Sequence, residues 1–303
     1  MEKLGQVWVV CADSAAAELT SGARELGESV TLVYAGRKNG AVNADKAFYL
    51  GPLGGEESFV NYAATAAELV GESMPELVLL DCGRDGRLVA ACIAVRCGVS
   101  IQTDAGSLSL GPKGVETSRM VYGGMALKTE RGGKTAVVCV GAGVFTAGKA
   151  EPCASVTELE RPQGRVRLVE KREKAGSSVN LTAARRIVGI GRGLADEQDV
   201  ESCRELADMI GAELGCTRPI CEERHWMPHE CYIGVSGLMV KPELYFAVGI
   251  SGQVQHVVGV SSSGTIIAID KDEAAPIFKA CDYGIVGDLH KILPTLKRLI
   301  AGK

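Results

Sequence analysis

The sequence predicts an α/β fold of two domains, each with a mainly parallel sheet. The chain has 303 residues, a length that suggests about two domains. Short apolar runs alternate with helical patterns, and this alternation is typical of parallel sheets covered by helices on both faces. Glycine accounts for 38 residues, well above the usual ~7%, and it supplies the tight strand–helix junctions that such a fold needs.

In the first half of the chain, candidate strands alternate with candidate helices. Strands are expected at 7–11, 30–34, 76–81 and 135–140. Helices are expected between them, at 14–26, 58–70 and 87–96. The stretch 151–186 is more polar, and we interpret it as an edge strand followed by a linker. We therefore place a first domain at 1–184 and a second at 185–303.

The second domain opens with an apolar strand that ends in the glycine turn 189–193. Its third glycine comes too early for the G-x-G-x-x-G spacing of dinucleotide-binding folds, because residue 194 is leucine. Arg192, inside this turn, would suit a phosphate. A helix is expected next, over Asp199–Leu214. Its apolar face would consist of Val200, Cys203, Leu206, Ala207, Ile210 and Leu214.

The segment 244–270 has the pattern of a strand, a tight turn, a helix start and a second strand. The apolar run Leu244–Ile250 stops at Ser251-Gly252, and Gln253–His256 then opens a short helix. A second apolar run, Thr265–Ile269, ends at Asp270. Unpaired N–H groups at a helix start bind anions. Together with the imidazole and two amides, they predict a site for a phosphate-bearing cofactor with a polar ring.

Composition excludes several classes of protein. The net charge of −4 argues against a nucleic-acid partner, which usually needs a basic face. No apolar run approaches the ~18 residues of a membrane span, and Val7–Cys11 is too short for a signal peptide. The eleven cysteines are an odd count without paired spacing, and most, such as Cys11, Cys92, Cys139 and Cys203, lie in apolar runs. We therefore expect free thiols and a cytoplasmic location.

Two further motifs are incomplete. Residues 143–149 nearly form a phosphate-binding P-loop, but Ala150 stands where the Mg²⁺-binding hydroxyl belongs. Cysteines and histidines crowd into 216–231 without a Cys-x-x-Cys pair, so no metal site is expected. No catalytic triad or paired-carboxylate arrangement is evident, and no hydrolytic activity is predicted.

The segment 244–270 resembles the signature of electron-transfer flavoprotein α subunits. That signature runs Leu-Tyr, Gly-Ile-Ser-Gly, Gln-His and an apolar strand ending in Ala-Ile-Asn, where this chain has Ala268-Ile269-Asp270. The segment 271–289, Gly191-Arg192-Gly193 and Thr217-Arg218-Pro219 also match family positions. The segments 120–127 and 224–245 are similar to the branch tied to nitrogen fixation and carnitine reduction.

The resemblance implies FAD as cofactor and assigns its contacts. Arg192 would contact the dinucleotide, and Arg218 would lie over the flavin and favour its reduced, negatively charged forms. Ser236 would hydrogen-bond flavin N5, and His256 would donate to flavin O2 and share charge with Arg218. Asp270 is expected at a ribose hydroxyl and Asp288 near the ADP half. The remaining implied FAD-binding residues are Thr217, Ile233, Gly234, Val235, Ser251, Gly252, Gln253, Val254, Gln255 and Leu289.

The resemblance also implies the fold and the partners. The first domain would be nucleotide-hydrolase-like without its catalytic set, and the second a doubly wound FAD domain. The chain would pair with a β subunit and carry electrons from a dehydrogenase, such as an acyl-CoA dehydrogenase, to an acceptor protein. It would be a carrier rather than a stand-alone enzyme, and a bifurcating complex is compatible with it. The alternatives are a nicotinamide-linked oxidoreductase and a non-redox adenine-nucleotide binding module.

Overall fold

The computed structural model describes residues 3–54, 57–112, 114–153, 155–160, 162, 164–170 and 180–302. The chain forms two compact units. Unit 1 comprises Met1–Met120 and Leu127–Arg172, and unit 2 comprises Val121–Ala126 and Glu173–Lys303. The domain boundary expected near residue 184 stays a prediction.

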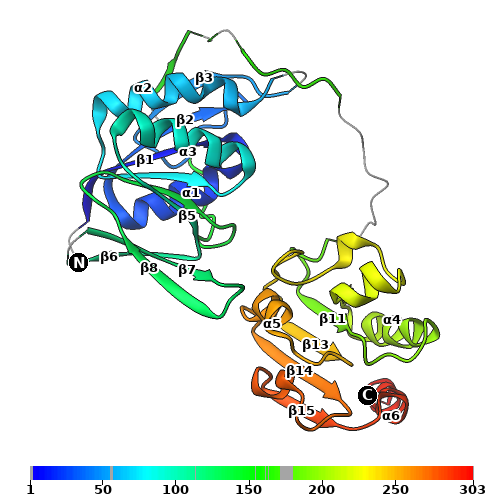
Figure 1. The fold of residues 1–303 in the computed structure, drawn as a ribbon. Helices are drawn as coiled ribbons and strands as arrows, with labels where there is room; N and C mark the ends of the chain where they lie inside the picture. The colour runs from blue at the N-terminus through cyan, green and yellow to red at the C-terminus, as the bar shows by residue number, and fades with distance from the viewer. Residues whose placement is uncertain are drawn as a thin grey trace. The chain divides into compact units, whose positions relative to one another are not determined.

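Unit 1 is built on a seven-stranded sheet whose neighbouring strands all run parallel (Figure 1). The strand order is β10-β3-β2-β1-β4-β9-β5. The bounds are β1 Leu4–Ala12, β2 Gly27–Ala35, β3 Lys46–Gly51, β4 Leu77–Asp81, β5 Ile101–Ala105, β9 Ala136–Val140 and β10 Val156–Glu158. The helices are α1 Asp13–Leu26, α2 Ala63–Ser73 and α3 Arg84–Cys97.

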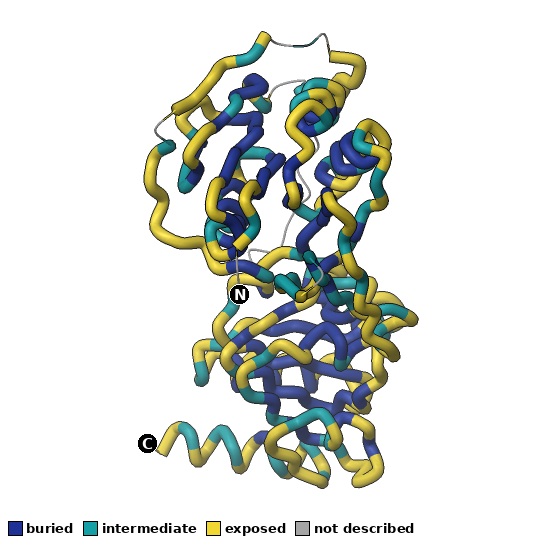
Figure 2. Tube along the Cα trace, turned by 90° about the vertical axis from the view of Figure 1, so that its left-hand side faces the viewer, coloured by how far each residue is buried: buried dark blue, intermediate teal, exposed yellow. Residues whose placement is uncertain are grey.

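Both faces of this sheet are buried because side chains alternate along each strand. In β1, Val7 and Val9 join the apolar cluster that contains Leu19 of α1. The intervening residues, such as Val10, join a second cluster with Ile93 of α3 and residues of α2. The helices therefore cover opposite faces of the sheet, as the strand–helix alternation predicts. Figure 2 shows buried strands in the interior of each unit.

A small three-stranded sheet accompanies the large one in unit 1. It consists of β6 Ser107–Gly111, β7 Gly114–Val121 and β8 Ala126–Arg131, in that order, with β6 and β7 antiparallel. These strands are not among the predicted ones, because they are mostly half-buried or exposed and carry no continuous apolar run.

Unit 2 is built on a five-stranded sheet in the order β12-β11-β13-β14-β15, again with all neighbours parallel. The strands are β11 Arg186–Ile190, β12 Glu213–Cys216, β13 Leu244–Val248, β14 Thr265–Asp270 and β15 Tyr283–Val286. The helices are α4 Gln198–Ile210, α5 Val254–Val260 and α6 Leu289–Ala301. One apolar cluster joins the strands to α4 and α6.

The predicted α/β fold with parallel sheets is confirmed, and two details are corrected. The helix expected to reach Leu214 ends at Ile210, because Gly211 takes the left-handed conformation at φ +61° and Leu214 belongs to β12. Cys92 is exposed rather than buried in an apolar run, whereas Cys11, Cys139 and Cys203 are buried, and all eleven thiols are free. The finer description of unit 2 as doubly wound stays a prediction.

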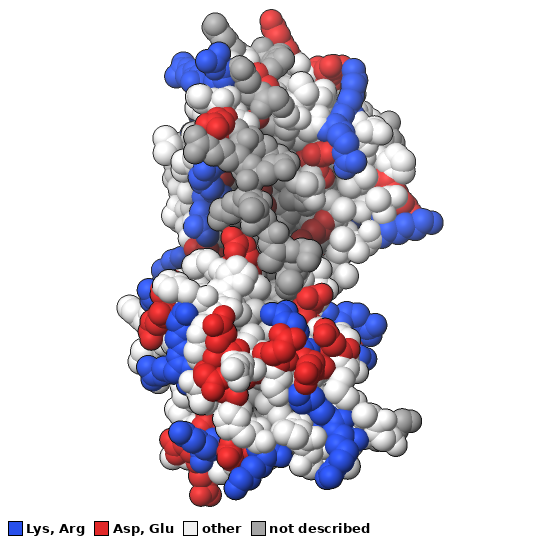
Figure 3. Space-filling model, turned by 90° about the vertical axis from the view of Figure 1, so that its right-hand side faces the viewer, with Lys and Arg blue, Asp and Glu red and all other residues white. Residues whose placement is uncertain are grey.

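None of the helices in the described part of the chain is long and apolar enough to cross a membrane. Acidic and basic side chains lie interspersed on the face of unit 2 that Figure 3 shows. Such a mixed surface differs from the basic face that nucleic-acid-binding proteins usually present.

The turn after β13 generates a test of the fold. Gly252 has φ +84°, and a Cβ built there would lie 2.2 Å from the backbone nitrogen of Ile277. We expect Gly252→Ala to lower the free energy of unfolding by more than about 3 kcal/mol, because it adds a backbone clash to the strain. Gly98→Ala is the matched control, since Gly98 has φ +68° with open space around it and should cost only about 1 kcal/mol. Urea unfolding of both variants measures the difference, and equal losses would contradict the structure.

Candidate functional site

A cavity of about 360 Å³ lies at the carboxyl ends of the strands of unit 2. Ligands of open parallel α/β sheets bind at this edge. Its walls come from the loops after β11, β12 and β13, from the loop 232–236 and from α5. The lining residues are Arg192, Thr217, Arg218, Pro219, Tyr232, Ile233, Ser236, Ile250, Ser251, Gln253, Gln255 and His256.

Glycines let two of these loops touch backbone to backbone. A Cβ on Gly191 would lie 2.4 Å from the carbonyl oxygen of Gly249, and one on Gly193 would lie 2.7 Å from the Cα of Gly249. The N–H of Gly193 donates to that same carbonyl at 2.8 Å. A side chain at either position would push the loops apart. The loop after β11 is thereby fixed against the loop after β13, and Arg192 lines the cavity beside Ser251.

The cavity presents positive charge. Two guanidinium groups, on Arg192 and Arg218, line it, and none of its twelve described lining residues is acidic. Amides and hydroxyls supply the other polar groups. This donor set is suited to an anionic ligand that also carries neutral polar atoms.

Thr217 supplies an unsatisfied group inside this cavity. Its backbone N–H donates to the carbonyl of Ile190 at 2.9 Å, which continues the strand pairing one residue beyond β12. Its hydroxyl oxygen is buried and has no hydrogen-bond partner among the described residues. Leaving a buried hydroxyl unpaired costs about 1–3 kcal/mol, so a ligand that pairs with it gains that stabilisation. An orphaned hydroxyl and two cations in one cavity fit a flavin dinucleotide.

His256 is held in one neutral tautomer: burial keeps the ring uncharged and two hydrogen bonds orient it. The carbonyl of Ile233 can only accept, so Nδ1–H of His256 donates to it at 3.0 Å. Nε2 is then an acceptor, and the hydroxyl of Tyr245 donates to it at 2.9 Å. Burial lowers the pKa of His256 to about 4. Both ring nitrogens are thus paired within the protein, and the imidazole lines the cavity. Its donation to flavin O2 and its sharing of charge with Arg218 stay predictions.

Room for this histidine–tyrosine pair depends on Gly189. A Cβ on Gly189 would lie 1.8 Å from the hydroxyl oxygen of Tyr245. Burial also raises the pKa of Tyr245, which keeps its hydroxyl protonated as the donor. Sequence reasoning missed Tyr245 because its neighbour in space, His256, lies eleven residues away. The residue type gave the only available signal: a tyrosine in a buried strand needs a partner for its hydroxyl.

The structure brings most of the predicted FAD residues to this cavity. Nine of them line it, and Tyr232, Pro219 and Ile250 are additional lining residues that sequence reasoning missed. Tyr232 could have been suspected from its spacing to Ser236, whose hydroxyl lies 3.0 Å from its own. The predicted residues outside the lining are Gly234, Val235, Gly252, Val254, Asp270, Asp288 and Leu289. Their contact with FAD stays a prediction.

Two of these outlying residues have local structural roles. A carboxylate oxygen of Asp270 accepts from the N–H of Asp272 at 2.9 Å, which closes the turn after β14. Asp288 caps α6 by accepting from the N–H of His290 at 3.0 Å. Both bonds are ones that asparagine can also make.

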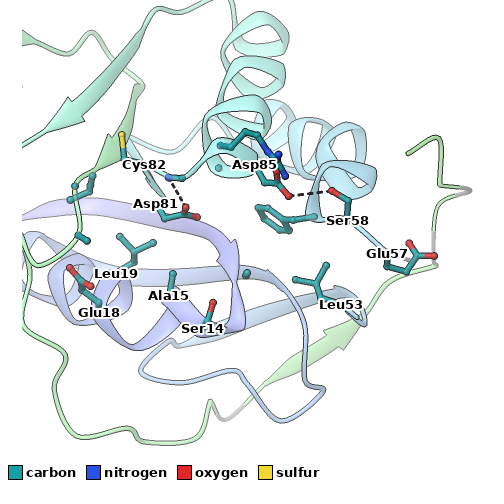
Figure 4. A pocket seen from close by; sticks show the side chains of 18 of the residues that line it. Ser14, Ala15, Glu18, Leu19, Leu53, Glu57, Ser58, Asp81, Cys82 and Asp85 are labelled. Atoms are coloured by element: carbon teal, nitrogen blue, oxygen red, sulfur yellow. Dashed lines mark hydrogen bonds and ion pairs between the residues drawn. The ribbon is translucent and has the colours of Figure 1, made fainter. Parts of the chain in front are cut away.

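A second, larger cavity of about 720 Å³ lies in unit 1 (Figure 4). It opens at the carboxyl ends of β1, β4 and β9, where α1 and α3 begin. Among its described lining residues, four carry carboxylates, Glu18, Glu57, Asp81 and Asp85, and one carries a guanidinium, Arg84. Such a lining repels phosphate, and it does not favour the alternative that this unit binds an adenine nucleotide.

Comparisons with known proteins locate this site within a recognised family. Residues 180–261 match the family model described as the electron transfer flavoprotein FAD-binding domain, and residues 11–170 match the electron transfer flavoprotein domain. The proteins called Protein FixB from Escherichia coli (strain SMS-3-5 / SECEC) and Salmonella typhimurium (strain LT2) are each 38% identical to this chain. Each match covers 99% of this chain and 100% of the relative. All twelve residues that line the cavity of unit 2 fall within 180–261.

The buried histidine predicts a pH dependence of stability. Its folded-state pKa of about 4 lies below the ordinary value of 6.5, so the unfolded chain binds more protons between these pH values. Stability is therefore fully present above pH 6.5 and is lost as the pH falls towards 4. At about 1.4 kcal/mol per pH unit, the loss should approach roughly 3 kcal/mol. Urea unfolding at a series of pH values should show a steeper acid loss for the native chain than for His256→Gln, and parallel curves would contradict the prediction.

The position of Asp270 predicts tolerance of asparagine. Because Asn Oδ1 can accept from the N–H of Asp272, Asp270→Asn should keep the turn and leave the dissociation constant for FAD within about threefold. Asp270→Ala removes the acceptor and should weaken FAD binding more than the asparagine variant does. Fluorescence titration with FAD measures both. If Asp270→Asn abolishes binding, the carboxylate has a role that the turn does not explain.

Proposed function

Because this chain belongs to the electron transfer flavoprotein α-subunit family, we propose that it carries electrons between partner proteins on an FAD held in the cavity of unit 2. The observation that best supports this is the joint presence of Arg192, Arg218 and the unpaired Thr217 hydroxyl in one cavity without acidic lining. FAD supplies the electron-transfer chemistry when bound. The residues around it determine its binding, its protonation and how readily it is reduced.

The chain's own groups divide this work. Arg192 and Ser251, whose loops meet at the glycine contact, would bind the dinucleotide. Arg218 supplies a permanent positive charge, which favours electron uptake by any group bound beside it. Ser236 supplies a hydroxyl group that forms a hydrogen bond with the hydroxyl of Tyr232, and either of the two can be the donor. Ile233 and Ile250 are buried and keep water from part of the cavity.

His256 has a different role in this proposal. With Nδ1–H bonded to Ile233 and Nε2 bonded to Tyr245, it presents a neutral ring with both nitrogens satisfied. Positive charge near the cofactor would then depend on Arg218 and Arg192 alone. A neutral histidine adds no positive charge to the cavity, so reduced flavin would be stabilised less than it would be beside an imidazolium.

The partners follow from the family. We propose that the chain works as a heterodimer with an electron-transfer flavoprotein β subunit. A dehydrogenase, such as an acyl-CoA dehydrogenase, would supply the electrons, and a second protein would accept them. Segments 120–127 and 224–245 resemble the branch tied to nitrogen fixation and carnitine reduction, and relatives 38% identical to this chain are named Protein FixB.

Reconstitution tests the proposal. The full chain, co-purified with its β partner, should show the flavin absorption spectrum and lose it on reduction by a dehydrogenase and its substrate. Arg218→Gln should slow this reduction by about tenfold or more, because a charge-assisted interaction with the reduced form is lost. Arg204→Gln, which removes a surface charge from α4 outside the cavity, is the control and should behave as the native chain does. Electron carriage would be refuted if the complex stays oxidised with every electron-donating dehydrogenase tested. The oxidoreductase alternative would be favoured if the complex is colourless and binds a nicotinamide cofactor.

A further inference from the structure

We propose that Glu222 sets the strength of the positive charge that Arg218 presents to the cofactor. This inference rests on the proposed placement of FAD in the cavity of unit 2. Nε–H of Arg218 donates to Oε2 of Glu222 at 2.6 Å. Within the part of the chain that the structure describes, Glu222 is the only carboxylate in an ion pair with Arg218.

The two members of the pair face different spaces. Arg218 lines the cavity, and Glu222 is absent from its lining. Glu222 instead lines a shallow depression next to it, together with His225, Trp226 and His229. The cation is thus on the cofactor side of the pair and the carboxylate behind it. A ligand in the cavity meets the positive end of a dipole rather than a lone cation, and the field that it experiences is weaker.

The backbone fixes this arrangement. Arg218 immediately precedes the π-helical turn Pro219–Glu223, and Ile220 and Cys221 in that turn are buried. The N–H of Arg224 donates to the carbonyl of Pro219 at 3.0 Å and closes the turn. The guanidinium of Arg224 lies 4.4 Å from the ring centre of Trp226 and donates to the carbonyl of Leu194 at 2.7 Å. The chain around Glu222 is anchored on both sides. This holds its carboxylate beside the guanidinium of Arg218, which lies four residues earlier in the sequence.

Binding through Nε also orients the guanidinium. Glu222 occupies one of its five N–H groups, and neither of its terminal nitrogens makes a hydrogen bond to another described residue. These terminal groups remain available to a ligand in the cavity. Arg218 holds the pKa of Glu222 below its usual range, so the carboxylate remains ionised at neutral pH. The second carboxylate oxygen lies 3.6 Å from Nε2 of His229.

Solvent limits the size of the effect. The side chain of Arg218 is 63% exposed and that of Glu222 is 35% exposed, so water screens their interaction. Glu222 acts through Arg218 and is a positioning residue, since it does not line the cavity itself. Removing its charge should strengthen the attraction between Arg218 and electron-rich, reduced FAD by a modest factor.

The test uses Glu222→Gln in the full chain, co-purified with the β partner and loaded with FAD. Glutamine keeps an acceptor oxygen for Arg218 and removes the charge. We expect its reduced-to-oxidised ratio at a fixed potential to rise about fivefold, which is about 20 mV for a two-electron couple. Glu223→Gln is the matched control, because it removes the same charge from the next residue of the turn. Glu223 lines neither the depression nor the cavity, so this variant should shift the ratio by less than threefold.

A double variant shows whether the effect passes through Arg218. In an Arg218→Gln background, Glu222→Gln should change the potential no more than Glu223→Gln does. A single variant that behaves like its control, or a shift that persists without Arg218, would overturn the proposal. The potential is measured by reductive titration against a reference dye, without donor or acceptor proteins. The result therefore does not depend on whether the chain carries electrons between proteins. A complex that shows the shift but transfers no electrons to partners would refute the proposed function and leave the role of Glu222 intact.

Discussion

The contact between the glycine backbones after β11 and β13 is the constraint on which the site depends. These two strands are neighbours, and their loops meet where Gly191 and Gly193 lie against Gly249. Parallel strands bring their carboxyl ends to one edge, but side chains at that point would hold the loops apart. Without side chains there, Arg192 and Ser251 line the same cavity although 59 positions separate them in the sequence. The loop after β12 forms a third wall, because the N–H of Thr217 donates to the carbonyl of Ile190 at the end of β11.

Burial decides which side chains of this cavity are charged. The imidazole of His256 is buried between Ile233 and Tyr245, where a charged ring would lose its hydration, so it remains neutral at physiological pH. Arg218 is largely exposed, keeps its charge, and is partly balanced by Glu222. Histidine and arginine therefore do not add their charges here, and one of the two cations that line the cavity, Arg218, is paired with a carboxylate. This combination favours binding of an anionic ligand without the full field of two or three unpaired cations.

The cavities of the two units illustrate how similar topology supports different chemistry. Both lie at the carboxyl ends of parallel strands, but the lining of the first is acidic and that of the second is basic. In unit 1, the carboxylates of Asp81 and Glu18 already accept backbone N–H groups. Asp81 accepts from Gly83 in its own loop at 2.9 Å, and Glu18 accepts from Gly143 in the loop after β9 at 2.6 Å. The fold provides a depression in each unit, and the side chains at the strand ends decide which ligands can enter it.

The sequence alone determined the fold class and the family. The apolar runs that became β1, β2, β4, β9, β13 and β14 were predictable because a parallel strand buried on both faces needs continuous apolar residues. The strands β6–β8 and β15 were not, because few of their residues are buried and they lack that signal. For the site, family positions identified nine of the twelve lining residues. Only the tertiary structure decided which side chains pair: that Tyr245 satisfies His256 and makes it an acceptor, and that Glu222 balances Arg218. It also decided that the hydroxyl of Thr217 has no hydrogen-bond partner among the described residues. Hydrogen bonds and pKa shifts depend on distances between atoms and on exclusion of water, and residue order along a chain specifies neither until the chain is folded.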